Sequence, residues 1–282
     1  MSQLFPRTMV GGVSLPRMLM GSNWILGYSH TSAAADAKIN ARNRNRDAIA
    51  EIAGVFLNAG VDAVMAPIAA NPVLMDGLKL AEDRAGKGFI RIDTPWMNVD
   101  DNAAARKECE AVVKASAAAG CKFCFPHHSS AEQLVNKNLQ AIPRLPDYLK
   151  MIRDAGMIPG LSAHMPELII YSDKNNYDVE TYVQIYNCMG FLMQIEVESI
   201  HNTIHNAKKP VMTIKAMAAG RCSPFVGLNF SYATLRDCDM VTVGCLTPQE
   251  AAEDIEFGLA AIERRRPGVA GRGSPKKTDI MK

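Results

Sequence analysis

Short apolar runs alternate along the chain with longer segments in which apolar residues recur every three or four positions. The short runs are typical of buried strands and the longer segments of amphipathic helices. The pattern predicts eight strands, at residues 17–20, 61–65, 88–92, 121–125, 158–162, 191–197, 210–214 and 240–243. It predicts helices at 47–58, 72–85, 101–119, 179–189 and 248–264, with one or two more between 131 and 155, where Pro143 and Pro146 interrupt the period.

Strands that alternate with helices along a chain are typical of a parallel sheet. Eight such units in 282 residues predict an α/β protein with a (β/α)8 TIM barrel, a fold of ~250 residues. A doubly wound open sheet is the alternative, but it usually has fewer units. No linker-like stretch divides the chain, so we expect a single barrel domain over residues 1–266. Residues 267–282, rich in Gly, Pro and charge, are predicted to form a disordered, flexible basic tail.

The net charge of +2 is unevenly distributed. Residues 264–282 hold seven basic side chains and one acidic one, a net charge of +6, which leaves −4 for the rest of the chain. A mildly acidic body is a poor binder of nucleic acid, because contacts to phosphate need a basic surface. Nucleic acid is therefore not expected as a partner.

The sequence contains no run of about 18 uncharged apolar residues, and its start lacks a basic region followed by an apolar stretch. We therefore expect neither a membrane-spanning helix nor a secretory signal. Seven scattered cysteines, an odd number, favour reduced thiols over a disulfide framework. These features predict a cytoplasmic protein whose partner is a small-molecule substrate, and they are compatible with a homo-oligomer.

The six histidines all follow the ends of predicted strands. His30 follows the first strand, His127 and His128 the fourth, His164 the fifth, and His201 and His205 the sixth. Active sites of barrel enzymes lie at the carboxyl ends of the strands, so these side chains are expected on the working face. We predict His127 and His164 as proton carriers or metal ligands, and His30 and His128 as substrate contacts. For His201 and His205, solvated surface positions are an equal alternative.

Two carboxylates and a lysine form a second candidate group. Gln194, Glu196 and Glu198 share one face of the predicted sixth strand, and Lys215 ends the neighbouring seventh. Buried carboxylates are costly unless they are paired or used. We predict Glu196 or Glu198 as a general base, with Lys215 as acid or electrostatic stabiliser. A structural salt bridge is the alternative, and a Schiff base on Lys215 is chemically allowed.

Further substrate contacts are expected from other strand ends. Asn23 and Tyr28 follow the first strand, Asp93 ends the third, and Gln194 lies beside the predicted base. Arg221 follows the seventh strand, in the region where this fold frequently holds phosphate, so we expect it to meet an anionic group. Histidines and carboxylates on one face are also compatible with a divalent metal ion, although no regular metal spacing identifies its ligands.

Four segments are similar to the aldo-keto reductase superfamily. They are TMVGGVSLPRMLMG at 8–21, AGMIPGLSAHMPELI at 155–169, Gln194-Ile195-Glu196, and VTVGCLTPQEAAEDIEFGL at 241–259. The resemblance implies a TIM barrel with a short N-terminal hairpin below its first strand. It also implies a nicotinamide cofactor, which Gln194 would touch.

The catalytic pattern of this family is mostly missing. Its reductases use an Asp, a Tyr, a Lys and a His, and only His127 matches. The predicted second strand ends without an aspartate or a nearby tyrosine, Asp93 stands where the lysine is expected, and Lys215 replaces an aromatic residue that stacks on the nicotinamide. Glu250 and Asp254 replace the basic residues that hold the adenosine phosphate. Reduction of a carbonyl therefore lacks its proton donor.

These observations favour an enzyme that uses acid/base chemistry, with or without a metal ion, on a polar sugar-like or carbonyl compound. The reaction class would be lyase, isomerase or hydrolase. One alternative is an NAD(P)-dependent oxidoreductase similar to the aldo-keto reductases. Another is a non-catalytic barrel subunit. A divalent metal is compatible as cofactor, and NAD(P) is less favoured.

Overall fold

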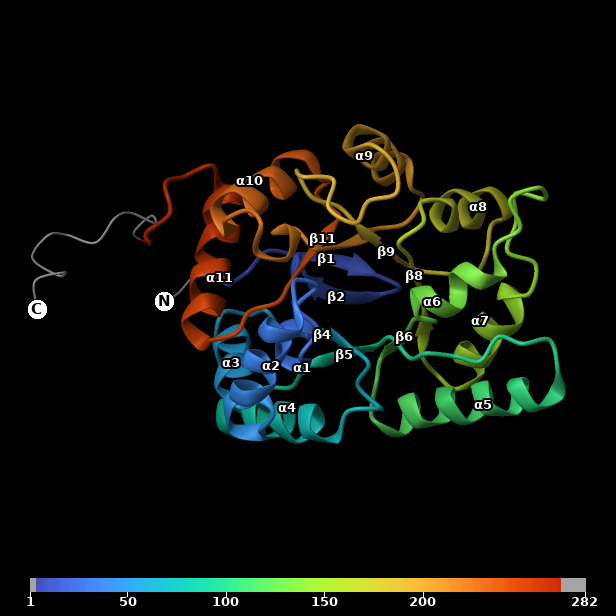
Figure 1. Cartoon of the computed structure of the whole chain (residues 1–282), viewed down its shortest axis with the longest axis horizontal. Helices are drawn as coiled ribbons and strands as arrows, with labels where there is room; N and C mark the ends of the chain where they lie inside the picture. The colour runs from blue at the N-terminus through green and yellow to red at the C-terminus, as the bar shows by residue number, and fades with distance from the viewer. Residues whose placement is uncertain (1–3, 270–282) are drawn as a thin grey trace, which may run out of the picture.

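Nine parallel strands form one sheet in the computed structural model, which describes residues 4–269 (Figure 1). The strands are β3 (Met18–Gly21), β4 (Ala63–Ala66), β5 (Ile90–Asp93), β6 (Phe123–Cys124), β7 (Ile158–Pro159), β8 (Leu161–Ser162), β9 (Tyr182–Ile185), β10 (Val211–Ile214) and β11 (Met240–Val243). Their order is β7-β6-β5-β4-β3-β11-β10-β9-β8. The two ends of this order, β7 and β8, are halves of one segment. The sheet therefore closes on itself, which confirms the predicted (β/α)8 barrel.

Gly160 separates β7 from β8 at the point of closure. A Cβ atom at this position would lie 2.5 Å from Cε1 of Phe125 and 2.9 Å from the carbonyl oxygen of Thr181. Only glycine lets the neighbouring segments approach this closely. The fifth barrel strand therefore pairs with β6 through its first half and with β9 through its second.

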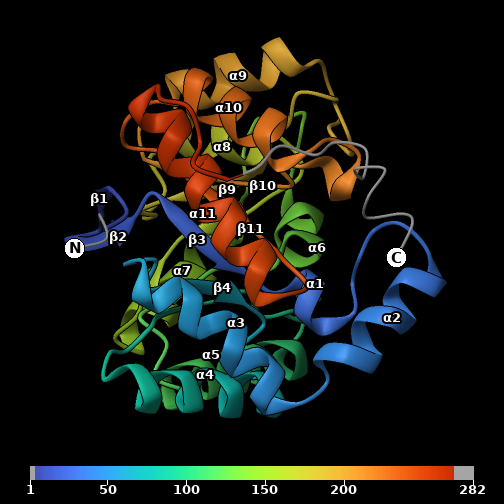
Figure 2. The ribbon, with the colours of Figure 1, turned by 90° about the vertical axis from the view of Figure 1, so that its left-hand side faces the viewer.

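Helices surround the barrel, as Figure 2 shows with α3, α4 and α5 on one side and α9 and α10 on the other. The helices are α1 (Asn23–Leu26), α2 (Ala33–Asn43), α3 (Arg46–Asn58), α4 (Pro72–Ala85), α5 (Ala103–Ala118), α6 (His128–Ala131), α7 (Leu145–Asp154), α8 (Glu167–Asn175), α9 (Val197–Asn206), α10 (Pro224–Thr234) and α11 (Pro248–Glu263), with short 3-10 helices η1 (Glu132–Leu134) and η2 (Ala218–Gly220). Thr247 caps α11 by accepting a hydrogen bond from the Glu250 amide. None of the helices in the described part of the chain is long and apolar enough to cross a membrane.

An antiparallel hairpin of β1 (Arg7–Val10) and β2 (Val13–Pro16) precedes the barrel. Its Val10 and Leu15 are buried and pack with barrel residues such as Leu19 and Met240. The hairpin thus covers the interior from the end where β3 begins, and the expected N-terminal hairpin is confirmed. The expected disordered tail falls mostly at 270–282, outside the described residues.

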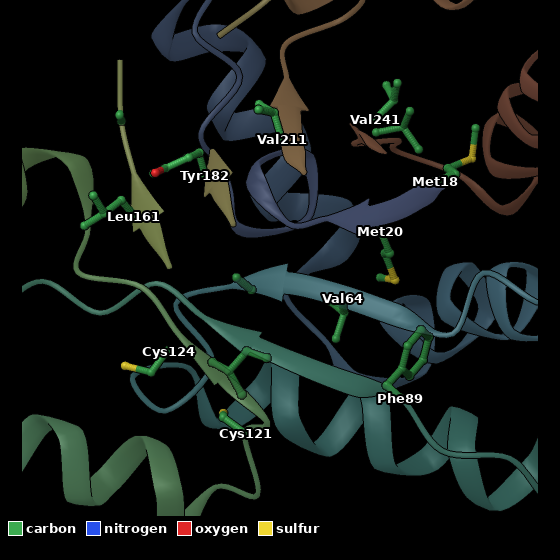
Figure 3. Packing of buried hydrophobic residues seen from close by; sticks show 14 of the residues in the cluster. Met18, Met20, Val64, Phe89, Cys121, Cys124, Leu161, Tyr182, Val211 and Val241 are labelled. Atoms are coloured by element: carbon green, nitrogen blue, oxygen red, sulfur yellow. The ribbon is translucent and has the colours of Figure 1, made fainter. Parts of the chain in front are cut away.

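Alternating strand residues divide the core into two layers. Met18, Met20, Val64 and Val241 face the surrounding helices, as Figure 3 shows for part of this layer. The strand residues that point the other way pack inside the barrel, together with two residues of the hairpin. This inner layer comprises Val10, Leu15, Leu19, Ala63, Met65, Ile92, Phe123, Phe125, Ile158, Val183, Met212 and Met240. Successive residues of a strand point to opposite faces of the sheet. Both layers are apolar because helices cover the outer face and the barrel interior encloses the inner one.

The predictions of a helix at 179–189 and of a sixth strand at 191–197 are wrong. The strand is β9, inside the predicted helix at 179–189, while residues 191–196 form turns and α9 begins at Val197. The apolar residues of Tyr182–Tyr186 fit a helical spacing, but all of them are buried on a strand whose two faces are both covered. The run 191–197 has an apolar composition, yet Leu192 and Ile195 are exposed.

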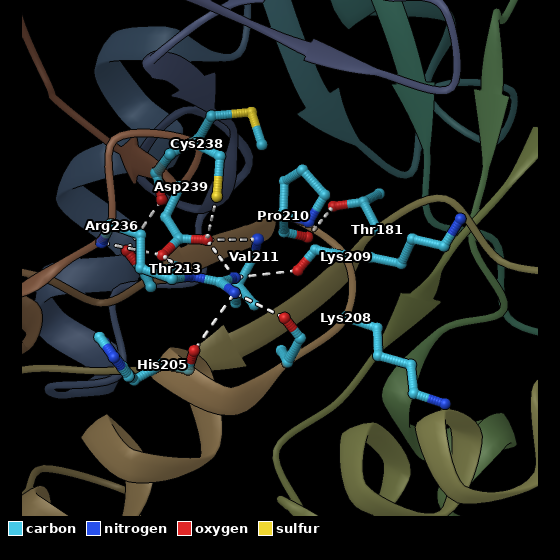
Figure 4. A network of polar contacts seen from close by, with 12 residues as sticks. Thr181, His205, Lys208, Lys209, Pro210, Val211, Thr213, Arg236, Cys238 and Asp239 are labelled. Atoms are coloured by element: carbon cyan, nitrogen blue, oxygen red, sulfur yellow. Dashed lines mark hydrogen bonds and ion pairs between the residues drawn. The ribbon is translucent and has the colours of Figure 1, made fainter.

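A polar network ties β10 to β11 at the ends where these strands begin (Figure 4). The fully buried Asp239 carboxylate accepts hydrogen bonds from the Val211 amide at 2.8 Å and pairs with the Arg236 guanidinium at 2.7 Å. Arg236 also donates to the carbonyl oxygen of Lys209. The network satisfies backbone groups at the closed end of the barrel, opposite the strand ends that carry the candidate site.

Candidate active site

A cavity of about 620 Å³ opens where the barrel strands end. Its lining comes from segments that follow strands throughout the barrel and includes Ser22, Asn23, Trp24, Tyr28, His30, Thr94, Trp96, His127, His128, Ser129, Ser162, His164, Lys215, Cys222, Thr242, Glu250, Glu253 and Asp254. The barrel thus brings together polar side chains from distant parts of the sequence. Active sites of this fold occupy the same place.

Lys215 enters the cavity through an unusual backbone conformation. It follows β10 with a φ of 64°, in the left-handed region that residues other than glycine rarely adopt. In a regular strand, neighbouring side chains point to opposite faces. Here Ile214 and Lys215 both line the cavity, because the positive φ ends the alternation at Lys215. The lysine would otherwise point toward the surrounding helices.

The Lys215 ammonium has no carboxylate partner. Among residues 4–269, none of the ion pairs includes it. Its Nζ atom lies 3.3 Å from Nε2 of His30. Burial in the cavity lowers the pKa of Lys215 to about 8, since desolvation disfavours the charged form.

His30 faces two donors at one ring nitrogen. The Asn23 Nδ2 atom lies 3.0 Å from Nε2 of His30, and the Lys215 Nζ atom approaches the same Nε2. Because an amide NH2 and an amine both donate, Nε2 acts as the acceptor and the ring proton lies on Nδ1. Burial, followed by the charge of Lys215, lowers the pKa of His30. The imidazole therefore presents a lone pair to the lysine.

Three further histidines gather after β6 and β8. The rings of His127 and His128 have centroids 4.2 Å apart, and those of His128 and His164 stack at 3.7 Å. Burial lowers the pKa of His127 to about 4 and that of His164 to about 3, with a further contribution from the neighbouring His128. The Ser129 amide donates to Nδ1 of His127, so the ring proton of His127 lies on Nε2. His127 and His164 are neutral at pH 7.

Glu132, which the sequence reasoning missed, joins this group from η1. Its Oε1 accepts hydrogen bonds from the amides of His164 at 2.6 Å and Met165 at 2.9 Å. Its Oε2 lies 3.8 Å from Nδ1 of His128, a buried nitrogen without a hydrogen-bond partner. The helical i, i+4 spacing of His128 and Glu132 is the sequence signal that could have indicated the pair.

These residues include a possible donor set for a metal ion. One ligand atom each from His128, Glu132 and His164 lies within 4.8 Å of the others. Two imidazoles and a carboxylate with open positions suit borderline divalent ions such as Zn²⁺ or Fe²⁺. The His128 and His164 rings are stacked, so one ring would have to turn before both lone pairs met a single ion.

Of the substrate contacts predicted from the sequence, Asn23, Tyr28, His30 and His128 line the cavity. Asp93 does not line it. Its buried carboxylate accepts hydrogen bonds from the Ser116 hydroxyl at 2.6 Å and the Ile68 amide at 2.7 Å, and burial raises its pKa. The carboxylate of Asp93 therefore connects β5 to neighbouring backbone and to α5.

The polar residues expected on one face of the sixth strand do not reach the cavity. Gln194, Glu196 and Glu198 are exposed at the start of α9 and in the turns before it, outside the cavity lining. The structure therefore does not bring these carboxylates to Lys215. These residues lie away from Lys215 because the sixth barrel strand is β9. The segment 191–197, on which they were expected to share a strand face, is not a strand.

The remaining predicted residues also lie outside the cavity lining. The Arg221 guanidinium lies over the Phe191 ring at 3.9 Å and donates to the Ala218 carbonyl oxygen. His201 and His205 belong to α9, where Nε2 of His201 contacts the Thr234 carbonyl oxygen at 3.1 Å. For these two histidines, the non-catalytic alternative agrees with their position.

No family model and no curated protein sequence matches the chain. Solved structures do match its fold. A protein assigned as an aldo-keto reductase of Pseudomonas aeruginosa has a TM-score of 0.64 and 13% identity, over 93% of this chain and 98% of that one. An aldo-keto reductase of Klebsiella pneumoniae in complex with NADPH has a TM-score of 0.54 and 12% identity, over 95% and 92%. A truncated 3-deoxy-D-arabino-heptulosonate 7-phosphate synthase of Thermotoga maritima has a TM-score of 0.52 and 11% identity, over 93% and 90%.

The chain has an aldo-keto reductase-like barrel fold. At these identities the likeness concerns the fold, which enzymes of different chemistry share. The basic groups that line the cavity in the described chain are Lys215 and the four histidines His30, His127, His128 and His164.

An acidic edge marks one side of the cavity in this aldo-keto reductase-like barrel. Glu250, Glu253 and Asp254 of α11 line it, and no arginine of residues 4–269 does. Burial, followed by the charges of Glu250 and Glu253, raises the pKa of Asp254 to about 8. Sequence reasoning identified two of these three residues through the resemblance. The carboxylates of Glu250 and Glu253 on this edge disfavour a bound phosphate by charge repulsion.

Proposed function

We propose that this protein is an enzyme of the lyase or isomerase type that acts on a small, uncharged carbonyl compound by acid/base chemistry. One observation carries the proposal: Lys215, a half-buried amine that pairs with no carboxylate of residues 4–269, shares a cavity with four histidines. Perturbed titratable groups that meet in a cleft are typical of catalytic sites. Lys215 is the central group of the proposed mechanism.

The proposed reaction begins with removal of a proton from the carbon beside the carbonyl group. A neutral imidazole accepts this proton, and His127 and His164 are the candidates because both line the cavity with Lys215. The electron pair moves to the carbonyl oxygen, which becomes an enolate oxygen. The Lys215 ammonium stabilises this developing negative charge.

The lining supports an uncharged, sugar-like substrate. Trp24, Tyr28 and Trp96 provide aromatic surface, while hydroxyl and amide side chains such as Asn23 and Thr94 provide hydrogen bonds. Aromatic faces and a few placed polar groups are typical of sites for small polar molecules. The acidic edge and the lack of an arginine in the described lining argue against a phosphorylated or carboxylated substrate.

Exchange of carbon-bound protons tests the proposal. The protein is incubated in deuterated buffer with dihydroxyacetone, glyceraldehyde or glycolaldehyde, and the loss of the α-proton signal is followed by NMR. We expect catalysed exchange with at least one of these compounds. Replacement of Lys215 by methionine should slow it by about 100-fold or more, since acid/base groups contribute ~10²–10⁴-fold. A wild-type rate equal to that of buffer would contradict the proposal.

Two variants serve as controls for this experiment. Lys114→Met removes an exposed lysine on α5 and should leave the exchange rate unchanged. Glu196→Gln should also leave it unchanged, because Glu196 lies outside the cavity lining. A loss of exchange in Glu196→Gln would instead support the carboxylate as the general base.

Metal assistance is a refinement of the same proposal, supported by the His128, Glu132 and His164 donor set. Elemental analysis of the purified protein tests it. A stoichiometric divalent metal that is lost in Glu132→Gln would support metal assistance. A metal-free protein with full exchange activity would exclude it.

An NAD(P)-dependent oxidoreductase is the second candidate, because the chain shares the fold of an aldo-keto reductase that binds NADPH. The acidic edge formed by Glu250, Glu253 and Asp254 speaks against it, since a pyrophosphate or a 2′-phosphate would meet carboxyl groups there. A non-catalytic barrel would bind ligands in the cavity without any proton exchange.

A further inference from the structure

We propose that Lys215 is a nucleophile that forms a Schiff base with the carbonyl carbon of an aldehyde or ketone in the cavity. This inference rests on the proposed function and deepens it. It changes the role of Lys215 from a charge beside the substrate to a covalent partner of it.

No carboxylate in the described part of the chain serves as a counter-ion for Lys215. Lys137, by contrast, is exposed and donates to the Glu167 carboxylate at 2.6 Å, which keeps that amine charged. Lys215 takes part in none of the ion pairs of the described chain, and burial lowers its pKa to about 8. A desolvated lysine without a carboxylate is the usual form of a Schiff-base nucleophile, because only the neutral amine has a lone pair.

A proton acceptor, His30, lies beside the Lys215 amine. Nε2 of His30 lies 3.3 Å from Nζ of Lys215, and the Asn23 amide fixes the same nitrogen as an acceptor. His30 can therefore take the proton that Lys215 must lose before it attacks. The His30 residue itself has a φ of 57°, so its loop is held in an unfavourable conformation that presents the ring at this position.

The backbone is strained at Lys215 and shortly after it. Lys215, Ala218 and Ala219 have φ values of 64°, 48° and 54°. Left-handed conformations are disfavoured for residues with a Cβ atom, and their concentration at one site is a feature of functional segments. The fold therefore maintains a conformation that turns one lysine into the cavity, beside groups from the loops after β3, β6 and β8.

The covalent step conserves atoms and charge. The Lys215 ammonium gives one proton to His30, and the Nζ lone pair forms a C–N bond while the carbonyl π electrons move to oxygen. A proton then moves from the nitrogen of this zwitterion to its alkoxide oxygen, which gives a neutral carbinolamine. The nitrogen lone pair forms the C=N bond as the C–O bond breaks, the oxygen leaves as water with the proton returned by His30, and a protonated imine remains. The net change is one carbonyl compound and one ammonium group giving one iminium group and one water.

Reductive trapping tests the inference directly. The intact protein is incubated with dihydroxyacetone, treated with sodium borohydride and examined by intact-protein and peptide mass spectrometry. We expect one adduct, with the mass of the ketone less one oxygen atom, on the peptide that contains Lys215. The adduct should fall at least ~100-fold in Lys215→Met and persist in Lys137→Met. Trapping on surface lysines alone would overturn the inference.

Lys215→Arg separates this inference from the proposed function. Arginine keeps the positive charge but forms no comparable imine. A nucleophilic role predicts that α-proton exchange is lost in Lys215→Arg as fully as in Lys215→Met. Exchange retained in the arginine variant, without trapping in the wild type, would overturn the Schiff base and leave the acid/base function standing. An adduct at Lys215 without exchange would support the nucleophile and overturn the proposed proton transfer. The far-ultraviolet circular dichroism of each variant verifies that it is folded.

Discussion

At the level of single residues, one backbone angle decides what the cavity contains. The positive φ of Lys215 turns its amine toward His30, whereas a regular strand would turn it toward the helices. Such a conformation costs ~1–3 kcal/mol and persists only where the surrounding structure enforces it. Asp254 carries a cost of another kind, because its carboxyl group is almost fully buried beside Glu250 and Glu253.

The burial of Asp254 predicts a specific dependence of stability on pH. Its pKa is raised from 3.8 to about 8, so between these values the folded protein holds a proton that the unfolded chain has lost. Folding then takes up a proton, and the contribution of Asp254 to the free energy of unfolding falls by ~1.4 kcal/mol per pH unit as the pH rises. Asp254→Asn should remove this loss.

Urea unfolding at several pH values between ~5 and ~8 measures the effect. The difference in unfolding free energy between Asp254→Asn and the wild type should grow in favour of the variant as the pH rises. Glu51→Gln, which removes an exposed carboxylate on α3, is the control and should show little such growth. A constant difference across the pH range would show that Asp254 is already ionised in the folded protein.

At the level of elements, the alternation of apolar runs and amphipathic segments predicted seven of the eight barrel strands at or near their observed positions. The failure at β9 has a local cause. Tyr182–Ile185 is only four residues long, and both of its faces are buried, so its composition does not distinguish a strand from a helix. The error moved Glu196 and Glu198 to a strand face, although they lie at the start of α9.

The histidine part of the site was accessible to sequence reasoning, because His30, His127, His128 and His164 all follow strands that were placed correctly. Other features were not accessible. The direction of Lys215 depends on a φ value that no periodicity encodes, and the position of Glu132 depends on the packing of η1 against the loop after β8.

The network at the start of β10 and β11 predicts a strong effect of a single substitution. Asp239→Ala removes the partner of Arg236 and leaves the Val211 amide without its acceptor. Loss of one partner of a buried ion pair costs ~3–5 kcal/mol. Urea unfolding should therefore show a loss of about 3 kcal/mol or more.

Asp237→Ala provides the matched control for this substitution. Asp237 is fully exposed and lies 3.4 Å from the Arg17 guanidinium. The buried Arg17 guanidinium also donates to the carbonyl oxygens of Asp239 and Arg236, and a fully exposed carboxylate contributes only ~0–1 kcal/mol, so this variant should unfold close to the wild type. Equal losses in Asp237→Ala and Asp239→Ala would mean that the buried network does not stabilise the barrel.

At the level of the whole molecule, barrel closure gives the cavity its charge pattern. The nitrogen groups come from the loops after β3, β6, β8 and β10, while the carboxyl groups come from α11. The cavity thus has an amine and imidazoles on one side and an acidic edge on another. This arrangement favours a small uncharged molecule over a dinucleotide, although the fold is shared with a reductase that binds NADPH.

The two tryptophans of the chain, Trp24 and Trp96, both line the cavity, so intrinsic fluorescence reports on ligand binding there. Titration with NADPH should produce no saturable quenching up to ~1 mM, the range of weak binding, because the phosphates would meet the acidic edge at Glu250 and Glu253. Dihydroxyacetone should change the fluorescence in the wild type, and Trp24→Phe shows which indole responds. Saturable quenching by micromolar NADPH would instead establish that a nicotinamide cofactor enters this cavity. In that case Lys215 and the histidines would have to be reconsidered as groups that bind a carbonyl substrate for hydride transfer.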